Sequence, residues 1–299
     1  MTIRTLRTFV AVADHATFTA AAAAVHVTHA AVSQQMRGLE EEWGVRLFDR
    51  SGRTPALTPL GRELVARARE VVRAYDELLP SVLAEDGLSG EVSVGALPTT
   101  LVGLVPRAVA RLRRARPGLH VRVVPGLTHD LVAQVESGAL GAAVVSRTAG
   151  LPSACLWADI ADEPLELLAS PRTGEADPLL LLREQPFIRF SRDAVVGGLI
   201  ENWLHDHGVE VRDAMELSSL EAISAMVMSG LGVSIAPRPC VPGHVELPLR
   251  RLPLAGGDGA VPARRLGLVW RGDTPRPRVV EEVLGTLVGA VARAADARA

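Results

Sequence analysis

The residues with the clearest chemistry in this chain lie on the outer face of a helix predicted over residues 29–42. Val32, Met36 and Leu39 recur at spacings of four and three residues, so they face inward and leave a polar face outside. Gln and Arg on such a face can read base edges in the major groove of DNA, while Ser and Thr can bind edges or phosphates. We predict that the residues of this helix that contact DNA are Thr28, His29, Ala30, Ser33, Gln34 and Arg37.

This helix is the second of a predicted pair that is separated by a short turn. Thr19 is placed to cap a first helix over residues 20–25, His26 and Val27 form the turn, and Thr28 caps the second helix. That order is typical of a helix-turn-helix DNA reader. The periodicity by itself is equally compatible with an ordinary helical hairpin that has a solvated polar face.

A basic turn follows the helix pair. Gly44 ends the second helix, and two short extended segments flank the turn, which is the arrangement of a wing. Thr58 and Pro59 then begin another helix, with Thr58 as its cap and Pro59 at its first position. In the wing, the residues that we predict to contact DNA are Arg50, Arg53 and Thr54.

The helix that begins at Pro59 is long and amphipathic, extending to about residue 85. Its apolar stripe must be buried against something, and the same helix of a second subunit is the most economical partner; packing onto its own chain is the alternative. Residues 86–90 then form a predicted hinge. For the dimer interface we predict Leu64, Ala68, Val71, Tyr75 and Leu78.

Taken together, these segments resemble the N-terminus of the LysR-type transcriptional regulators. The resemblance lies in AVSQQMRGLE as a recognition helix, GVRLFDR as a strand, an arginine-bearing wing, and LTPLGREL entering a linker helix, with LRTFVAVADHATFTAAA upstream. It covers roughly residues 3–85 without a gap. His29, Gln34 and Gly38 depart from the residues usual in the family, which affects the base preference expected and not the mode of docking.

From residue 90 onward the pattern changes to alternating strands and helices. The first part reads as βαβαβ, which predicts a parallel, doubly wound sheet. The resemblance implies two Rossmann-like subdomains around a cleft, as in periplasmic solute-binding proteins. The predicted strands are EVSVGAL, LHVRVVPG, LGAAVVS, LELLASP, PFIRFS, VEVRDAMELS, GVSIAPR and LGLVWR.

We therefore expect an α/β effector domain preceded by an all-α winged helix-turn-helix domain and a linker helix. The expected boundaries are 1–58 for the DNA-binding domain, 59–89 for the linker helix and hinge, and 90–299 for the effector domain, with subdomain I at about 90–162 and 267–299 and subdomain II at about 163–266.

Ligands of such folds sit where strand ends meet helix N-termini, and free backbone N–H groups there favour anions. The resemblance implies that hydroxyl and backbone groups at Thr99, Thr100, Ser146, Ser218 and Ser219 hold a small carboxylate. Arg147, Arg189 and Ser191 also follow predicted strands or lie within them, and we add them to the candidate effector site.

Composition and motifs exclude several other classes. No secretory signal or run of 18 apolar residues is visible, which favours a cytoplasmic protein. Cys155 and Cys240 stand far apart without metal-ligand spacing, and His205 and His207 diverge on a helix, so we expect neither a metal nor a cofactor. No GxSxG, HExxH or phosphate-loop motif appears, so we expect no enzyme.

The sequence thus predicts a transcription regulator that binds double-stranded DNA as a homodimer, with a homotetramer implied by the resemblance, and that responds to a small, anionic effector. The net charge is only −2, so the positive field needed for DNA must be local. The alternatives are a cytoplasmic small-molecule-binding protein and a cleft enzyme, each with an accessory helical domain.

Overall fold

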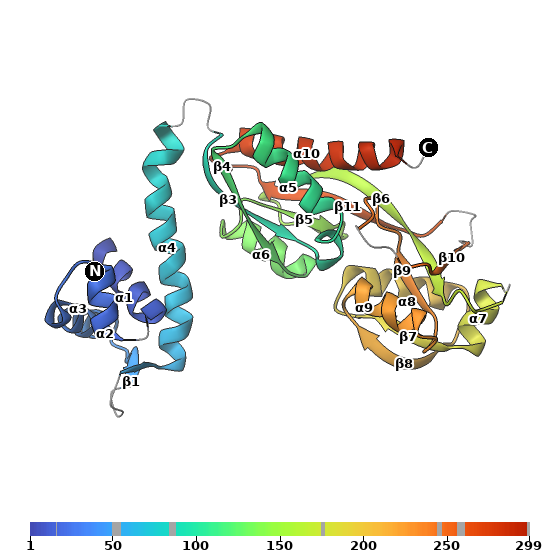
Figure 1. Cartoon of the computed structure of the whole chain (residues 1–299), viewed down its shortest axis with the longest axis horizontal. Coiled ribbons are helices and arrows are strands. Elements are labelled where there is room, and N and C mark those ends of the chain that lie inside the picture. Colours follow the sequence, from blue (N-terminus) through green and yellow to red (C-terminus); the bar gives the residue numbers. More distant parts are fainter. Residues whose placement is uncertain are drawn as a thin grey trace. The chain divides into compact units, whose positions relative to one another are not determined.

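The computed structural model describes residues 1–15, 17–49, 55–83, 88–174, 177–243, 247–255 and 261–297 (Figure 1). The chain divides into two compact units, Met1–Glu85 and Asp86–Ala299, which are treated separately below.

The first unit is a group of helices with a small hairpin. Its hydrophobic core contains Phe9, Phe18 and Phe48, whose rings pack edge to face, and Met36 and Leu39 of the third helix. The elements of this unit are α1 (Ile3–His15), α2 (Phe18–Ala24), α3 (His29–Trp43), β1 (Phe48–Asp49), β2 (Ala56–Leu57) and α4 (Pro59–Leu83).

The caps of these helices explain where they begin and end. The Thr28 hydroxyl accepts a hydrogen bond from Ala31 N at 3.2 Å, and Gly44 ends α3 in the left-handed conformation with φ +67°. Thr58 caps α4 by accepting from Gly61 N at 3.0 Å. These starts and ends agree with the sequence pattern.

The predicted cap of α2 was wrong. Thr17, not Thr19, is the N-cap, and its hydroxyl accepts from Ala20 N at 3.2 Å. Thr19 lies inside the first turn of the helix. The reason is Phe18, which is only 6% exposed and begins the helix so that its ring can enter the core.

The second unit is built on a mixed sheet with the strand order β10-β6-β11-β5-β3-β4, and β9 also pairs with β6. Strand β3 is parallel to β4 and β5, as the βαβαβ pattern predicts, while β11 returns antiparallel between β5 and β6. The strands of this sheet are β3 (Gly90–Ala96), β4 (Leu119–Pro125), β5 (Ala142–Ser146), β6 (Cys155–Ala169), β9 (Ser234–Pro237), β10 (Arg250–Pro253) and β11 (Ala263–Arg271).

Three hydrophobic clusters lie in the described part of this unit. Two belong to the first predicted subdomain, one with Val94 and Leu268 and the other with Leu131 and Val145, and the third, in the second predicted subdomain, contains Leu167 and Ile223. The remaining elements are η1 (Pro98–Thr100), α5 (Leu104–Ala115), α6 (Thr128–Glu136), α7 (Pro178–Glu184), β7 (Pro186–Phe190), α8 (Val195–Asp206), β8 (Arg212–Leu217), α9 (Leu220–Met228) and α10 (Pro277–Asp296).

Strand β6 is the main departure from the sequence prediction in this unit. The pattern indicates a strand only from Leu165, whereas the structure has one continuous strand from Cys155 to Ala169. Its first half pairs with β11 and its second half with β9 and β10, so it passes from one core to the other. The charged residues of the first half hide it from a search for apolar runs, because they face solvent or partners on β11.

Candidate DNA-binding face and effector pocket

Helix α3 presents a polar face to solvent. Thr28, His29, Ala30, Gln34 and Arg37 are exposed and Ser33 is half-buried, as the helical period predicts. Opposite them, Val32, Met36 and Leu39 are at most 1% exposed, which holds the helix firmly on its unit. A helix anchored by one apolar face can place the other in a major groove without rearranging.

The hairpin beside α3 is described only at its base. Phe48 of β1 pairs with Leu57 of β2 in an antiparallel register. The predicted wing residues Arg50, Arg53 and Thr54 lie outside the described residues. Arg46, which the sequence predicts as part of the local positive field but not as a DNA contact, is exposed just before β1 and lines a surface hollow together with Arg37 and Glu41.

Helix α4 divides its apolar stripe between two directions. Ala68, one of the predicted interface residues, is only 4% exposed because it packs into the core of its own unit, and Leu64 is half-buried beside it. Val71, Tyr75 and Leu78 are 50%, 51% and 61% exposed. The arginines of two ion pairs, Arg7–Asp76 and Arg69–Asp14, tie another face of α4 to α1.

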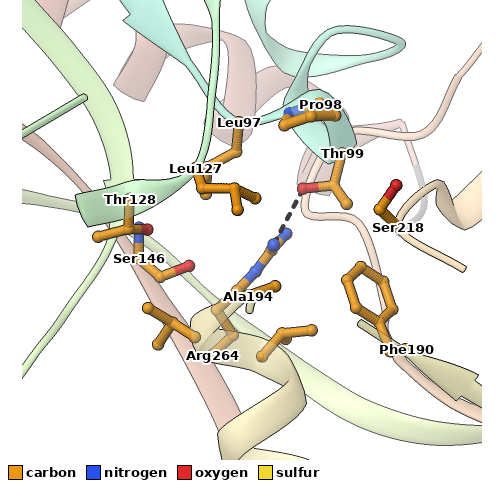
Figure 2. Close-up of a pocket in the computed structure, with 12 residues that line it drawn as sticks. Leu97, Pro98, Thr99, Leu127, Thr128, Ser146, Phe190, Ala194, Ser218 and Arg264 are labelled. Atoms are coloured by element: carbon orange, nitrogen blue, oxygen red, sulfur yellow. Dashed lines mark hydrogen bonds between the residues drawn. The ribbon is translucent and has the colours of Figure 1, made fainter. Parts of the chain in front are cut away.

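A pocket lies at the carboxyl ends of β3 and β5 in the second unit, lined by residues of both predicted subdomains (Figure 2). About 360 Å³ of space free of protein atoms lies in it, part of it open to solvent. Hydroxyl groups, apolar side chains and one guanidinium form its wall. The lining residues are Leu97, Pro98, Thr99, Leu127, Thr128, Ser146, Phe190, Ala194, Val195, Val196, Ser218 and Arg264.

Arg264 of β11 is the cation of this pocket. It is 3% exposed and forms an ion pair with Glu163 of β6, which is 2% exposed, with Nε donating to Oε2 at 3.0 Å. The Arg264 Nη1 also donates to Thr99 Oγ1 at 2.9 Å, as Figure 2 shows. The other Glu163 oxygen accepts from Cys240 N at 2.8 Å. The guanidinium is therefore held in one orientation, with one edge toward the pocket.

Arg264 is absent from the residues predicted for the effector site, although the sequence contains a signal for it. Successive side chains of a strand point to opposite faces, so Arg264 lies on the same face of β11 as the buried Leu266 and Leu268. An arginine at an inward position of an apolar strand must be paired or bound to something, because an unpaired buried charge is costly. Sequence alone does not reveal Glu163 as its partner.

The predicted effector residues separate into those that line the pocket and those that do not. Thr99, Ser146 and Ser218 line it. The Thr100 hydroxyl instead donates to Leu97 O at 2.7 Å, and Ser219 caps α9 by accepting from Ala222 N at 3.2 Å. Both hydroxyl groups therefore hold local backbone.

The other predicted effector residues also have partners elsewhere. The Arg147 guanidinium lies 4.8 Å from the ring centroid of Trp157 and is exposed. Arg189 is 5% exposed and donates to Asp213 at 2.7 Å from Nη2. The Ser191 hydroxyl accepts from Asp193 N at 3.4 Å. None of them lines the described pocket.

The arginines beside Asp213 lower the pKa of its carboxyl group. Burial acts to raise the pKa of the Asp213 carboxyl, but hydrogen bonds from Arg189 and Arg192 outweigh it, so the pKa lies below its ordinary value. This carboxylate remains charged near neutral pH and keeps its hydrogen bonds with Arg189.

Both cysteines are held as neutral thiols. Desolvation by burial, followed by the nearby Glu136 carboxylate, raises the pKa of Cys155. Burial and then Glu163 raise the pKa of Cys240 to about 12. Thiolates are the reactive form of cysteine, so neither thiol is activated as a nucleophile.

Within the described residues, no group of three or more His, Cys, Asp or Glu side chains could hold a metal ion. The ring of His207, one of the two histidines noted in the sequence, stacks on Trp203 with 4.3 Å between the ring centroids. No helix in the described part of the chain is long and apolar enough to cross a membrane.

Comparisons with known proteins agree on one family. A family model described as the LysR substrate binding domain matches residues 85–292, and one for the bacterial regulatory helix-turn-helix protein of the lysR family matches residues 3–62. The chain is 35% identical to a probable hydrogen peroxide-inducible genes activator of Mycobacterium avium, over 96% of this chain and 93% of that protein. It is 29% identical to the RuBisCO operon transcriptional regulator of Allochromatium vinosum, over 91% of this chain and 90% of that protein.

Solved structures of similar proteins have the same fold. A cysteine variant of full-length OxyR from Pseudomonas aeruginosa superposes with a TM-score of 0.65 at 28% identity, covering 96% of this chain and 94% of that one. The regulator CbnR in complex with its target DNA superposes with a TM-score of 0.71 at 23% identity, covering 98% and 100%.

Proposed function

The chain belongs to the LysR family of bacterial transcription regulators, and from its geometry we propose how it reads DNA and what kind of effector it senses. As a member of this family it binds DNA, and an effector in its second unit modulates that activity. The relatives named above are regulators and not enzymes. We infer that it acts in the cytoplasm, where its DNA is located.

Helix α3 is our proposed reader of the operator. The single observation that supports this most is its capped, exposed polar face, with Gln34 and Arg37 on the surface and a firmly buried apolar face behind them. Gln34 is suited to a bidentate contact with adenine, and Arg37 to guanine or phosphate. The arginines of the hairpin, Arg50 and Arg53, would add contacts to flanking DNA.

We also propose that α4 pairs with its counterpart in a second subunit. The exposed side chains of Val71, Tyr75 and Leu78 support this, since they recur at spacings of four and three residues on one face. Two recognition helices in one dimer would then enter successive major grooves. Pairing of such dimers into a tetramer is the form that the family resemblance implies.

The effector that best fits the pocket is a small molecule with an anionic group and an apolar body. Arg264 and the hydroxyls of Thr99 and Ser146 offer donors, and the N-terminus of α6 adds a favourable dipole. Leu127 and Phe190 supply apolar wall. Because Glu163 already balances the Arg264 charge, the anion would be bound largely by hydrogen bonds of fixed direction.

A second candidate is a response to hydrogen peroxide, because several relatives are named for it. The arrangement of the thiols argues against a disulfide between them. Cys155 begins β6, and Cys240 lies beside Glu163, eight residues along that strand. Eight strand residues span about 26 Å, whereas a disulfide needs Cα atoms within about 7 Å. We therefore favour reversible ligand binding.

Selective DNA binding is the experiment that tests this function. The whole chain would select duplexes from a random pool, and its affinity for a selected and a scrambled duplex would be measured across a salt series. We expect selective binding with a steep salt dependence, and we expect Gln34→Ala to reduce selectivity by about tenfold. Gln134→Ala on α6 is the matched control and should change neither quantity. Equal affinity for both duplexes would contradict the proposed function.

A further inference from the structure

Glu40 lies near the C-terminal end of α3 and reaches back to the chain that follows the helix. One of its carboxylate oxygens, Oε1, accepts hydrogen bonds from Leu47 N at 2.8 Å and from Phe48 N at 3.0 Å. These are the residues at which the chain enters β1, and they are 0% and 3% exposed. Two successive buried backbone donors therefore depend on one carboxylate from the reading helix.

The carbonyl of Leu47 is engaged on the opposite side by the start of α4. It accepts from Thr58 N at 3.0 Å and from the Thr58 hydroxyl at 3.4 Å. A Cβ at Gly61 would collide with the same carbonyl oxygen, so α4 can approach this closely only with glycine there. The peptide groups of Leu47 thus connect α3, the β1–β2 hairpin and α4.

We propose that Glu40 is a positioning residue for DNA binding, which fixes the β1–β2 hairpin relative to the reading face of α3. This inference rests on the proposed role of α3 as the DNA reader. A hairpin held to the same helix that enters the major groove reaches the flanking DNA in one register. Without the carboxylate, Leu47 N and Phe48 N lose their acceptor, and the base of the hairpin loses the hydrogen bonds that join it to α3.

Neighbouring glutamates make the inference testable. Glu41 is exposed and lines the same surface hollow, but no hydrogen bond from it to β1 appears among the described residues. Gln at position 40 keeps an oxygen that can accept both bonds, while Ala has none. Glu40→Ala, Glu40→Gln and Glu41→Ala therefore separate the hydrogen bonds from the charge and from general effects at this end of the helix.

The experiment measures affinity for two duplexes, one selected by the wild-type chain and one trimmed at both ends so that no DNA remains beneath the hairpin. We expect wild type and Glu41→Ala to lose about tenfold in affinity on trimming. Glu40→Ala should bind the long duplex about tenfold more weakly and lose less than about twofold on trimming, and Glu40→Gln should restore the wild-type behaviour. All titrations would be made well below the unfolding temperature of each variant.

If Glu40→Ala loses as much affinity on trimming as the wild type does, the inference is overturned. It is also overturned if Glu40→Gln does not show the tenfold loss of affinity that trimming causes in the wild type. A wild-type chain that selects no duplex at all would instead overturn the proposed function. The two failures are thus distinguishable.

A second pair of variants approaches the same peptide from α4. Gly61→Ala places a methyl group against the Leu47 carbonyl, whereas the Cβ of Gly285→Ala on α10 meets nothing within 4 Å. We expect Gly61→Ala to weaken the dependence on flanking DNA and Gly285→Ala to retain it. Equal behaviour of the two variants would contradict a junction at Leu47.

Discussion

At the residue scale, the effector pocket depends on how a buried cation is satisfied. Arg264 is neutralised by Glu163 and oriented by Thr99, so its buried guanidinium is not an unpaired charge, and we propose that it also contacts the effector. Replacement of Arg264 or Glu163 by a neutral residue would leave the other as an unpaired buried charge, which is strongly destabilising. The Thr99 hydroxyl is therefore a better position at which to test ligand binding.

Thr99→Val keeps the shape of the side chain and removes its hydroxyl. We expect about fivefold weaker binding of an anionic effector, since a lost hydrogen bond of this kind is worth about 1 kcal/mol. The measurement is calorimetric titration with the carboxylate that stabilises the wild type most in a thermal-shift panel. Thr100→Val is the control: its hydroxyl serves Leu97 O, so stability should fall while affinity does not change. Unchanged affinity in Thr99→Val would remove this residue from the site.

The raised pKa of Cys240 gives a prediction about pH. Its ordinary value is 9.0 and burial with Glu163 raises it to about 12, so the unfolded chain releases this proton at a lower pH than the folded chain does. Folding stability from this group is therefore present below about pH 9 and is lost as pH rises toward 12. We expect iodoacetamide to modify Cys240 slowly in the native protein at pH 8 and rapidly in guanidinium, as followed by mass spectrometry. Rapid native modification would show that the thiol is activated.

At the element scale, α4 shows how one apolar stripe can serve two purposes. Val65 and Ala68 are 4% exposed in the core of their own unit, while Val71 and Tyr75 remain at the surface. The sequence pattern correctly predicts an amphipathic helix, yet it assigns Ala68 and Tyr75 to one interface. The helical period determines the face of the helix on which a side chain lies. Which neighbouring element packs against that face depends on the tertiary structure.

Val71→Asp tests the exposed part of this stripe. We expect it to shift the chain from dimer toward monomer, because an aspartate cannot be buried in an apolar seam without a partner. Sedimentation velocity over a range of concentrations would measure the change. Glu63→Arg alters charge on an exposed face of the same helix outside the stripe and should leave the dimer intact. A dimer of undiminished stability in Val71→Asp would place the interface elsewhere.

At the scale of the whole molecule, the second unit has its own cores and its own sheet. Strands β6 and β11 run antiparallel and belong to the first of its two parts, while β6 continues into the second. Arg264 and Glu163 lie on these two strands, where the parts are joined. A ligand that contacts Phe190 on one side and Ser146 on the other can therefore change how the two parts sit together.

The division into units predicts that each function is separable. A chain of residues 86–299 contains all three hydrophobic clusters described in the second unit and should fold and bind the effector with the affinity of the whole protein. It should not bind the selected duplex, because α3 is absent. Calorimetric titration and a DNA-binding assay on the same preparation measure the two properties. Loss of ligand binding with folding retained would show that the first unit contributes to the pocket.

The helix starts and ends could be predicted from the sequence because they depend on residues close together in the chain. Thr28 before a helical period, Gly44 after it, and Thr58-Pro59 at the next start define helices through bonds within a few residues. The mixed sheet was predicted in its βαβαβ part and missed in the first half of β6, where charged residues interrupt the apolar run.

The sequence alone determined the outer face of α3 and the βαβαβ order that begins the second unit, because both follow from side-chain periodicity and capping; the class of the domains followed from the family resemblance. Only the tertiary structure decided which polar residues share a site. It placed Arg264 in the pocket and paired Arg189 with Asp213, and it connected Glu40 to Leu47 and Phe48. These partners are set by how strands and helices pack in space, where residues far apart in the chain satisfy one another's charges and hydrogen bonds.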